Sequence, residues 1–244
     1  MRATEFEFRY RFWVIFGLFW AGFGAYSIQH ANLAVLLLRA LSPGSETNDN
    51  ALRAVFGFAA LLGIGAAALR SWASAYLRSN IVHDTALRTD GLVADGPFRY
   101  VRNPLYLGNI LLSLGMALLM SPLGACILVF GQTFFLIRLI HREEWELLQS
   151  EGDRFSAYRA AVPMLVPSLK PRVPAGRVEP HVVEGLVGES FSWIIALSMV
   201  AFALTLNSRI IPYFVGVGFV VYWLLFVVWK KRGRPAASAE KPAG

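Results

Sequence analysis

The sequence predicts an all-α integral membrane protein with about six transmembrane helices and both termini in the cytoplasm. Its composition, its apolar runs and the distribution of its basic residues each predict this class. Of the 244 residues, 56% are hydrophobic and only 16% are charged, and the mean hydropathy is +0.50. This composition excludes a disordered chain, and because soluble domains carry about 25% charged residues it favours an integral membrane protein over a water-soluble globule.

Six apolar runs approach or reach the roughly 20 residues that an α-helix needs to cross a bilayer. The expected spans are residues 12–38, 54–77, 105–120, 122–140, 189–206 and 210–229. The third and fourth spans meet at Ser121 and Pro122, and proline suits the first turn of a new helix. We therefore expect a tight helical hairpin at this junction.

The basic residues determine the expected orientation. Of the 23 Lys and Arg residues, 20 lie in the N-terminal segment, in the segments Arg70–Arg102 and Arg138–Arg177, and in the tail. The other three loops carry only Arg39, Arg53 and Arg209. By the positive-inside rule both termini are cytoplasmic. The net charge of +7 then reflects membrane topology, and we expect no nucleic-acid partner.

The chain divides into four expected regions. Residues 1–87 form an N-terminal two-helix membrane region, and residues 88–169 form a core that holds the motifs described below. Residues 170–229 supply a linker and two further spans, and residues 230–244 form a disordered basic tail. One cysteine, Cys126, excludes an internal disulfide. No His-Glu-x-x-His or related spacing occurs, so we expect no metal.

The first motif surrounds the start of the third span. Gly96-Pro97 marks a turn, and Asn103 is the expected N-cap of a helix that begins at Pro104. A helix N-terminus offers unpaired N–H groups and a partial positive charge, to which Arg99 and Arg102 add. The pattern predicts a cradle for a carboxylate or phosphate. The alternative is that both arginines are membrane anchors and that Asn103 only caps a helix.

The second motif lies at the cytoplasmic end of the fourth span. Four residues share one helical face by their spacing: Arg138, His141, Arg142 and Trp145. Glu143 and Glu144 point about 100 degrees apart on a helix, so they cannot serve one small site equally. A carboxylate here suits a ribose diol or an amine. The alternative is a solvated helix end with weak Glu–Arg pairs, which we prefer for Glu146 and Glu151.

Arg138 is the best candidate to orient an anionic substrate group, because an arginine inside the membrane is costly and usually functional. Its alternative role is to extend its charged end to the lipid headgroups. In a third segment, Phe155, Tyr158 and Val162 form an amphipathic stripe that we expect on the bilayer surface.

Taken in order, these segments resemble the membrane methyltransferase superfamily of isoprenylcysteine carboxyl methyltransferases and phospholipid N-methyltransferases. The resemblance covers about residues 88–168. The matching elements read Arg102-Asn-Pro-Leu-Tyr-Leu-Gly108, Glu143-Glu-Trp-Glu-Leu147, Gly152 to Tyr158, and Val162-Pro-Met-Leu-Val-Pro167. The isoprenylcysteine enzymes usually carry His where this chain has Asn103.

The resemblance implies that S-adenosylmethionine is bound at the cytoplasmic end of the helical hairpin, in a multi-pass protein of a bacterial inner membrane. The family closes this cofactor between the Arg-Asn-Pro turn and the Glu-Glu helix. The residues that would bind it are Gly96, Tyr100, Val101, Arg102, Asn103, Tyr106, Glu143 and Glu144. The candidate catalytic residues are Arg138, His141 and Glu144.

The acceptor is left open by the sequence. A carboxylate of an isoprenylcysteine-like or isoprenoid molecule needs no base, whereas a phospholipid head amine needs one, which His141 or Glu144 would supply. A membrane reductase that binds NADPH is a further alternative, but a 2′-phosphate favours arginine over the Glu-Glu element. A non-enzymatic transporter or scaffold is the last alternative. Broken helices or charges at the membrane midplane would support it, and the sequence shows few of either.

Overall fold

The computed structural model describes residues 2–43, 48–83, 93–176 and 178–210, with residues 213, 216–218 and 220 beyond them. Within these ranges the regular structure is helical, with no strand, as predicted. The α-helices are α1 (Glu5–Arg9), α2 (Arg11–Gly24), α3 (Leu33–Leu41), α4 (Asp49–His83), α5 (Pro104–Ala117), α6 (Pro122–Glu151), α7 (Asp153–Ala161), α8 (Val182–Gly188) and α9 (Ser190–Thr205). Two short 3-10 helices are η1 (Ala25–Ser27) and η2 (Gly96–Arg99).

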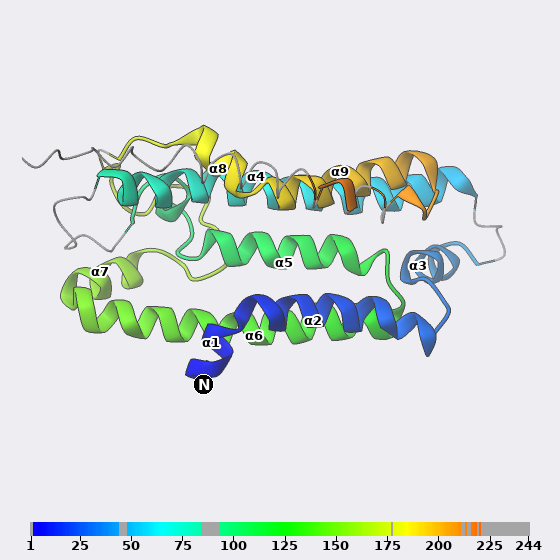
Figure 1. The fold of residues 1–244 in the computed structure, drawn as a ribbon, viewed down its shortest axis with the longest axis horizontal. Coiled ribbons are helices and arrows are strands. Elements are labelled where there is room, and N and C mark those ends of the chain that lie inside the picture. Colours follow the sequence, from blue (N-terminus) through cyan, green and yellow to red (C-terminus); the bar gives the residue numbers. More distant parts are fainter. Residues whose placement is uncertain are drawn as a thin grey trace, which may run out of the picture.

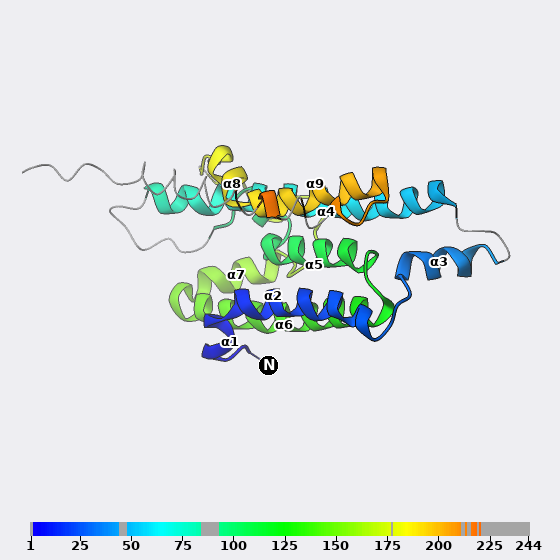
Figure 2. The same ribbon diagram turned by 45° about the vertical axis from the view of Figure 1, so that its right-hand side comes forward.

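The long helices run side by side in three layers (Figures 1 and 2). Helices α4 and α9 form one outer layer, α5 lies in the middle, and α2 and α6 form the other outer layer. Helix α7 folds back at one end of α6, and α3 crosses at the opposite end of the bundle. The candidate site described below lies at the end that carries α7.

Two of the described helices are long and apolar enough to cross a membrane: Asp49–Leu77 within α4, and α6. Helices α8 and α9 pass the same test as a pair bent by 65°, and α5 is a shorter apolar helix. The second and fourth predicted spans are thus matched by candidate spans, and the fifth is matched if the bent pair counts as one span, whereas α5 is shorter than the predicted third span. The full set of six spans and the cytoplasmic termini stay predictions, and most of residues 210–229, together with the tail at 230–244, lies outside the described residues.

The first predicted span, residues 12–38, is not one continuous helix. Helix α2 ends at Gly24, and α3 begins only at Leu33. Asn32 caps the new helix, because its side-chain oxygen accepts hydrogen bonds from the N–H groups of Ala34 and Val35. The mean hydropathy of this run stays high although it contains three polar residues, Gln29, His30 and Asn32. The chain turns at these residues, between α2 and α3.

The predicted hairpin between α5 and α6 is confirmed. Ser121 is the N-cap of α6, and its hydroxyl accepts a hydrogen bond from the N–H of Gly124 at 3.2 Å. Pro122 occupies the first helical position, where its missing N–H is not needed. Gly124 also lies against the backbone of Gly22, so that α2 and α6 approach closely at this level.

A buried polar network joins α4, α5 and α9, and sequence reasoning did not find it. The Nε of Arg70 lies 2.7 Å from a carboxylate oxygen of Glu189. The same guanidinium donates to the side-chain oxygen of Asn109 at 2.7 Å and to the carbonyl of Leu105 at 3.2 Å. Glu189 accepts further hydrogen bonds from Ser74 and Ser192. The network places the bend between α8 and α9 against the first turns of α5.

Candidate functional site

The turn that precedes α5 is positioned by Gly96. This residue has a φ of +55°, and a Cβ atom added there would collide with the ring of Tyr76. Glycine is therefore required both for the backbone conformation and for the close approach. The predicted Gly96-Pro97 turn is confirmed and takes the form of the 3-10 helix η2.

The segment from η2 to α5 is held from the other side by the chain that follows α7. The N–H of Arg102 donates to the carbonyl of Pro163 at 2.8 Å, and the N–H of Ser168 donates to the carbonyl of Tyr100 at 3.0 Å. The carbonyl of Arg99 likewise accepts from the N–H of Arg172. Several main-chain groups between Gly96 and Val101 are thus already bonded within the protein.

Asn103 precedes α5 as predicted, but its side chain does not cap the helix. Its amide nitrogen instead lies 3.3 Å from a carboxylate oxygen of Glu144 and 3.2 Å from the carbonyl of Met164. The backbone of Asn103, at φ −122° and ψ 61°, lies outside the extended conformation usual for a side-chain cap. Asn103 therefore bridges the start of α5 to α6 and to the segment after α7.

Arg102 was expected to help bind an anionic ligand, but its guanidinium pairs with a carboxylate of the chain itself. The Nε of Arg102 lies 2.9 Å from Glu144, in an ion pair whose side chains are 10% and 8% exposed. A second arginine, Arg159 on α7, lies 3.7 Å from the other oxygen of Glu144. The guanidinium of Arg102 also donates to the carbonyls of Arg159 and Val162. Two arginines compensate the burial of this charged carboxylate.

Glu143 and Glu144 face different partners, as their angular separation on a helix requires. The hydroxyl of Tyr106 donates a hydrogen bond of 2.6 Å to Glu143, whereas Glu144 is held by Arg102 and Asn103. Tyr106 lies one turn after Asn103 on α5, so the two pairs of residues join α5 to α6 side by side. The two predicted motifs therefore meet in space.

A pocket of about 180 Å³ opens between these motifs. Its polar wall contains five of the predicted cofactor residues: Arg102, Asn103, Tyr106, Glu143 and Glu144. Its apolar wall contains Leu77, Val93, Phe98, Pro104, Leu105, Leu147 and Phe155, and Tyr158 completes it. The other predicted residues, Gly96, Tyr100 and Val101, stand beside the pocket without lining it.

The model of the isoprenylcysteine carboxyl methyltransferase (ICMT) family matches residues 59–149. Over these residues the chain is similar to that family. The match begins in α4, includes η2 and α5, and ends near the end of α6, so it contains both motifs that form the polar wall. The resemblance inferred from the sequence is thereby confirmed. No curated protein and no solved structure matches the chain.

Helix α7 lies outside the ICMT match, and it covers the pocket instead of lying on the bilayer surface. Phe155, Tyr158 and Val162 are buried at 1%, 6% and 1% exposure, and they pack on Ala94 and Leu147. The expected surface stripe is therefore wrong: these side chains face the protein interior, and Arg102 donates hydrogen bonds to the carbonyls of Arg159 and Val162 at the end of α7. The hydroxyl of Tyr158 donates to the carbonyl of Phe98 at 2.8 Å. Burial raises the pKa of Tyr158, so the hydroxyl stays protonated near neutral pH.

The structure does not bring Arg138 and His141 to this pocket. Arg138 forms an ion pair of 2.7 Å with Glu7 of α1 and donates to the carbonyl of Arg2. His141 is exposed. Their predicted roles in substrate orientation and proton transfer stay predictions. The pairing of Arg138 with Glu7 could not be predicted from the sequence, because the two residues are 131 positions apart.

Sequence reasoning also missed one residue that lines the pocket, Phe98, and one that contacts a lining residue, Arg159. Arg159 reaches Glu144 from α7, although the sequence offered it only as one cytoplasmic charge among many. Phe98 presents its side chain to the pocket and its carbonyl to Tyr158. Its place directly after Gly96-Pro97 was the available signal, because a turn-forming glycine and proline position the residue that follows them.

Proposed function

We propose that the protein uses S-adenosylmethionine to methylate a lipophilic membrane substrate, most directly the carboxylate of an isoprenylcysteine-like or isoprenoid molecule. The similarity of residues 59–149 to the ICMT family supports membrane methyl transfer in general. The observation that carries the finer proposal is the meeting of the Arg102–Tyr106 segment with Glu143 and Glu144 at one pocket.

The residues at this pocket fit the chemical groups of S-adenosylmethionine. Glu143 accepts one hydrogen bond from Tyr106, and its remaining lone pairs suit a ribose diol or an ammonium group. Phe98, Leu147 and Phe155 offer apolar surface for an adenine ring. When bound, the cofactor supplies a methyl group on a positively charged sulfur. The chain's own residues would then bind, orient the two reactants and exclude water.

The hydrogen bonds at the pocket favour a carboxylate acceptor over an amine. A lipid amine must lose a proton before it attacks, and its proton must reach a base. The carboxylate of Glu144 is held by Arg102 and Asn103, and Glu143 is held by Tyr106. His141 is exposed and lies outside the pocket wall. A carboxylate acceptor needs no base, so this site suits it without rearrangement.

A transfer assay with radiolabelled S-adenosylmethionine tests the acceptor. The purified protein would be offered an S-prenylated cysteine derivative with a free carboxyl group and, separately, vesicles that contain phosphatidylethanolamine. We expect label in a base-labile methyl ester of the first acceptor. Label in the phospholipid headgroup would replace the carboxylate proposal with the amine alternative.

Tyr106→Phe tests whether the orientation of Glu143 matters to cofactor binding. Loss of the 2.6 Å hydrogen bond frees Glu143 to rotate, and hydrogen bonds to charged groups contribute about 1.5–3 kcal/mol. We expect about tenfold weaker binding of S-adenosylhomocysteine by calorimetry. Tyr26→Phe is the matched control, because the hydroxyl of Tyr26 bonds to the carbonyl of Leu119 at the other end of the bundle. Equal losses in both variants would contradict the role of Glu143.

A further inference from the structure

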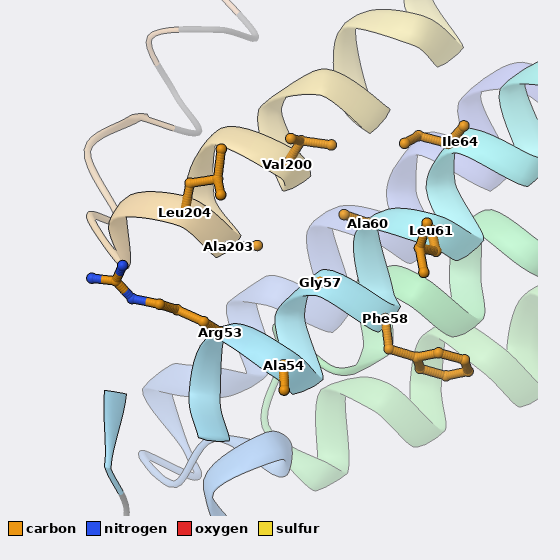
Figure 3. A pocket seen from close by; sticks show the side chains of 10 residues that line it. All are labelled: Arg53, Ala54, Gly57, Phe58, Ala60, Leu61, Ile64, Val200, Ala203 and Leu204. Carbon is orange, nitrogen blue, oxygen red and sulfur yellow. The ribbon is translucent and has the colours of Figure 1, made fainter. Parts of the chain in front are cut away.

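A second concavity lies between α4 and α9, at the end of the bundle opposite to the pocket (Figure 3). Its volume is about 540 Å³. It is lined by Arg53, Ala54, Gly57, Phe58, Ala60, Leu61, Ile64, Val200, Ala203 and Leu204. At the ordinary helical rise, Leu77 of the pocket lies about 36 Å further along α4 than Arg53. This groove is therefore separate from the proposed methyl-transfer site.

The groove is apolar except at one end. Small residues, Gly57 and Ala60 of α4 and Ala203 of α9, leave space between the two helices. Its larger lining residues are largely exposed, at 66% for Leu61 and 65% for Leu204. The groove therefore opens outward along a helix that is long and apolar enough to cross a membrane, and a lipid chain can reach it from the side.

Among the described residues that line the groove, Arg53 alone is charged. It is exposed, and within the described part of the chain it has no ion pair or hydrogen-bonded side-chain partner. Figure 3 shows its guanidinium extending from the beginning of α4 toward the end of α9. Arg53 lies near the end of a membrane span, at the depth of the lipid headgroups, where its charge attracts an anionic phosphate.

The length of the groove matches one leaflet of a bilayer. From Arg53 to Ile64, α4 rises about 16 Å, and half of the hydrocarbon core is about 15 Å. We propose that the groove binds one anionic phospholipid, with its phosphate at Arg53 and one acyl chain lying along Gly57 and Ala60 toward Ile64. This lipid is not the methyl acceptor, because it lies at the wrong end of the bundle.

The described part of the chain after α9 offers no competing occupant. Gly218 lies so close to Ile194 that a Cβ atom added to Gly218 would collide with the Ile194 side chain. Ile194 is not part of the groove lining, and neither Tyr213 nor residues 216–218 and 220 line it. An acyl chain with an anionic headgroup agrees with both the apolar lining and the cation at its end.

Native mass spectrometry of the delipidated protein in detergent tests this site. The protein would be titrated with phosphatidylglycerol and, in parallel, with phosphatidylcholine. We expect one preferred phosphatidylglycerol, and Arg53→Gln should weaken its binding about fivefold, the effect of one basic residue near a charged membrane surface. The matched control is Arg39→Gln, which removes an exposed arginine of α3 that does not line the groove. Unchanged binding in Arg53→Gln, or an equal loss in Arg39→Gln, would overturn the proposal.

A second variant tests the acyl-chain part of the groove. A Cβ atom at Gly57 meets no other atom within 4 Å, and leucine is a better helix former than glycine. Gly57→Leu should therefore keep the fold, as checked by circular dichroism, and reduce phosphatidylglycerol binding at least as much as Arg53→Gln. Full lipid binding by Gly57→Leu would place the lipid elsewhere. If the unsubstituted protein forms a dimer that Gly57→Leu dissociates, a second copy of the chain is the occupant, and the proposal is overturned.

Discussion

Replacing Glu144 with glutamine is expected to weaken binding of S-adenosylhomocysteine by at least tenfold while the helical fold persists. The substitution keeps the shape of the side chain but removes the charge that compensates Arg102 and Arg159. Arg102 then remains buried without its counter-charge, and hydrogen bonds to charged groups contribute about 1.5–3 kcal/mol. Since Arg102 also holds the end of α7 through the carbonyls of Arg159 and Val162, the cover of the pocket should loosen too.

Isothermal titration calorimetry in detergent measures this effect directly. Glu146→Gln is the matched control, because Glu146 lies two residues further along α6 and forms an exposed pair with Arg142. Such a surface pair contributes about 0.3–0.5 kcal/mol, so the control should bind like the unsubstituted protein. Unchanged affinity in Glu144→Gln would remove Glu144 from the site.

Replacing Glu189 with alanine is expected to produce the largest loss of stability. The ion pair between Arg70 and Glu189 has side chains that are 18% and 10% exposed, and three helices meet at it. Removal of one partner from a buried pair costs about 3–5 kcal/mol, because the remaining charge is left uncompensated. The thermal unfolding midpoint in detergent should fall clearly. Glu184→Ala on α8 should change it little, since its contact with His181 is 3.8 Å long and the two side chains are 30% and 36% exposed.

A double substitution separates charge compensation from simple packing. If the uncompensated charge of Arg70 causes the loss, then Arg70→Met combined with Glu189→Leu should recover much of the stability, because apolar replacement of a whole buried pair is often neutral or stabilising. A double variant that is less stable than Glu189→Ala would show that the hydrogen bonds to Leu105 and Asn109 carry the stability instead.

The parts of the fold that could be predicted from sequence depend on local signals. Ser121 and Pro122 define the hairpin because a cap and a first-turn proline act within one turn of a helix. The break between α2 and α3 was missed because three polar residues inside a long apolar run barely change its mean hydropathy. The pair of Arg70 and Glu189 was missed because 119 residues separate its members, and no periodic pattern links them.

At the candidate site, too, local features could be predicted from the sequence and long-range contacts could not. The two motifs were identifiable, because each carries its own spacing. That Arg102 binds Glu144, or that Arg138 binds Glu7, depends on how α5, α6 and α1 pack, and a single sequence holds no direct record of that packing. The expected surface stripe on α7 was wrong for a related reason: an amphipathic helix faces inward as readily onto protein as onto lipid.

The central claim is that the pocket between α5 and α6 binds S-adenosylmethionine. Calorimetric titration of the detergent-purified protein with S-adenosylhomocysteine tests it most directly, with NADPH as the parallel ligand and circular dichroism to show that the protein is folded. We predict saturable binding at one site for S-adenosylhomocysteine and none for NADPH. Folded protein that binds no S-adenosylhomocysteine, or that binds NADPH in its place, would contradict the claim.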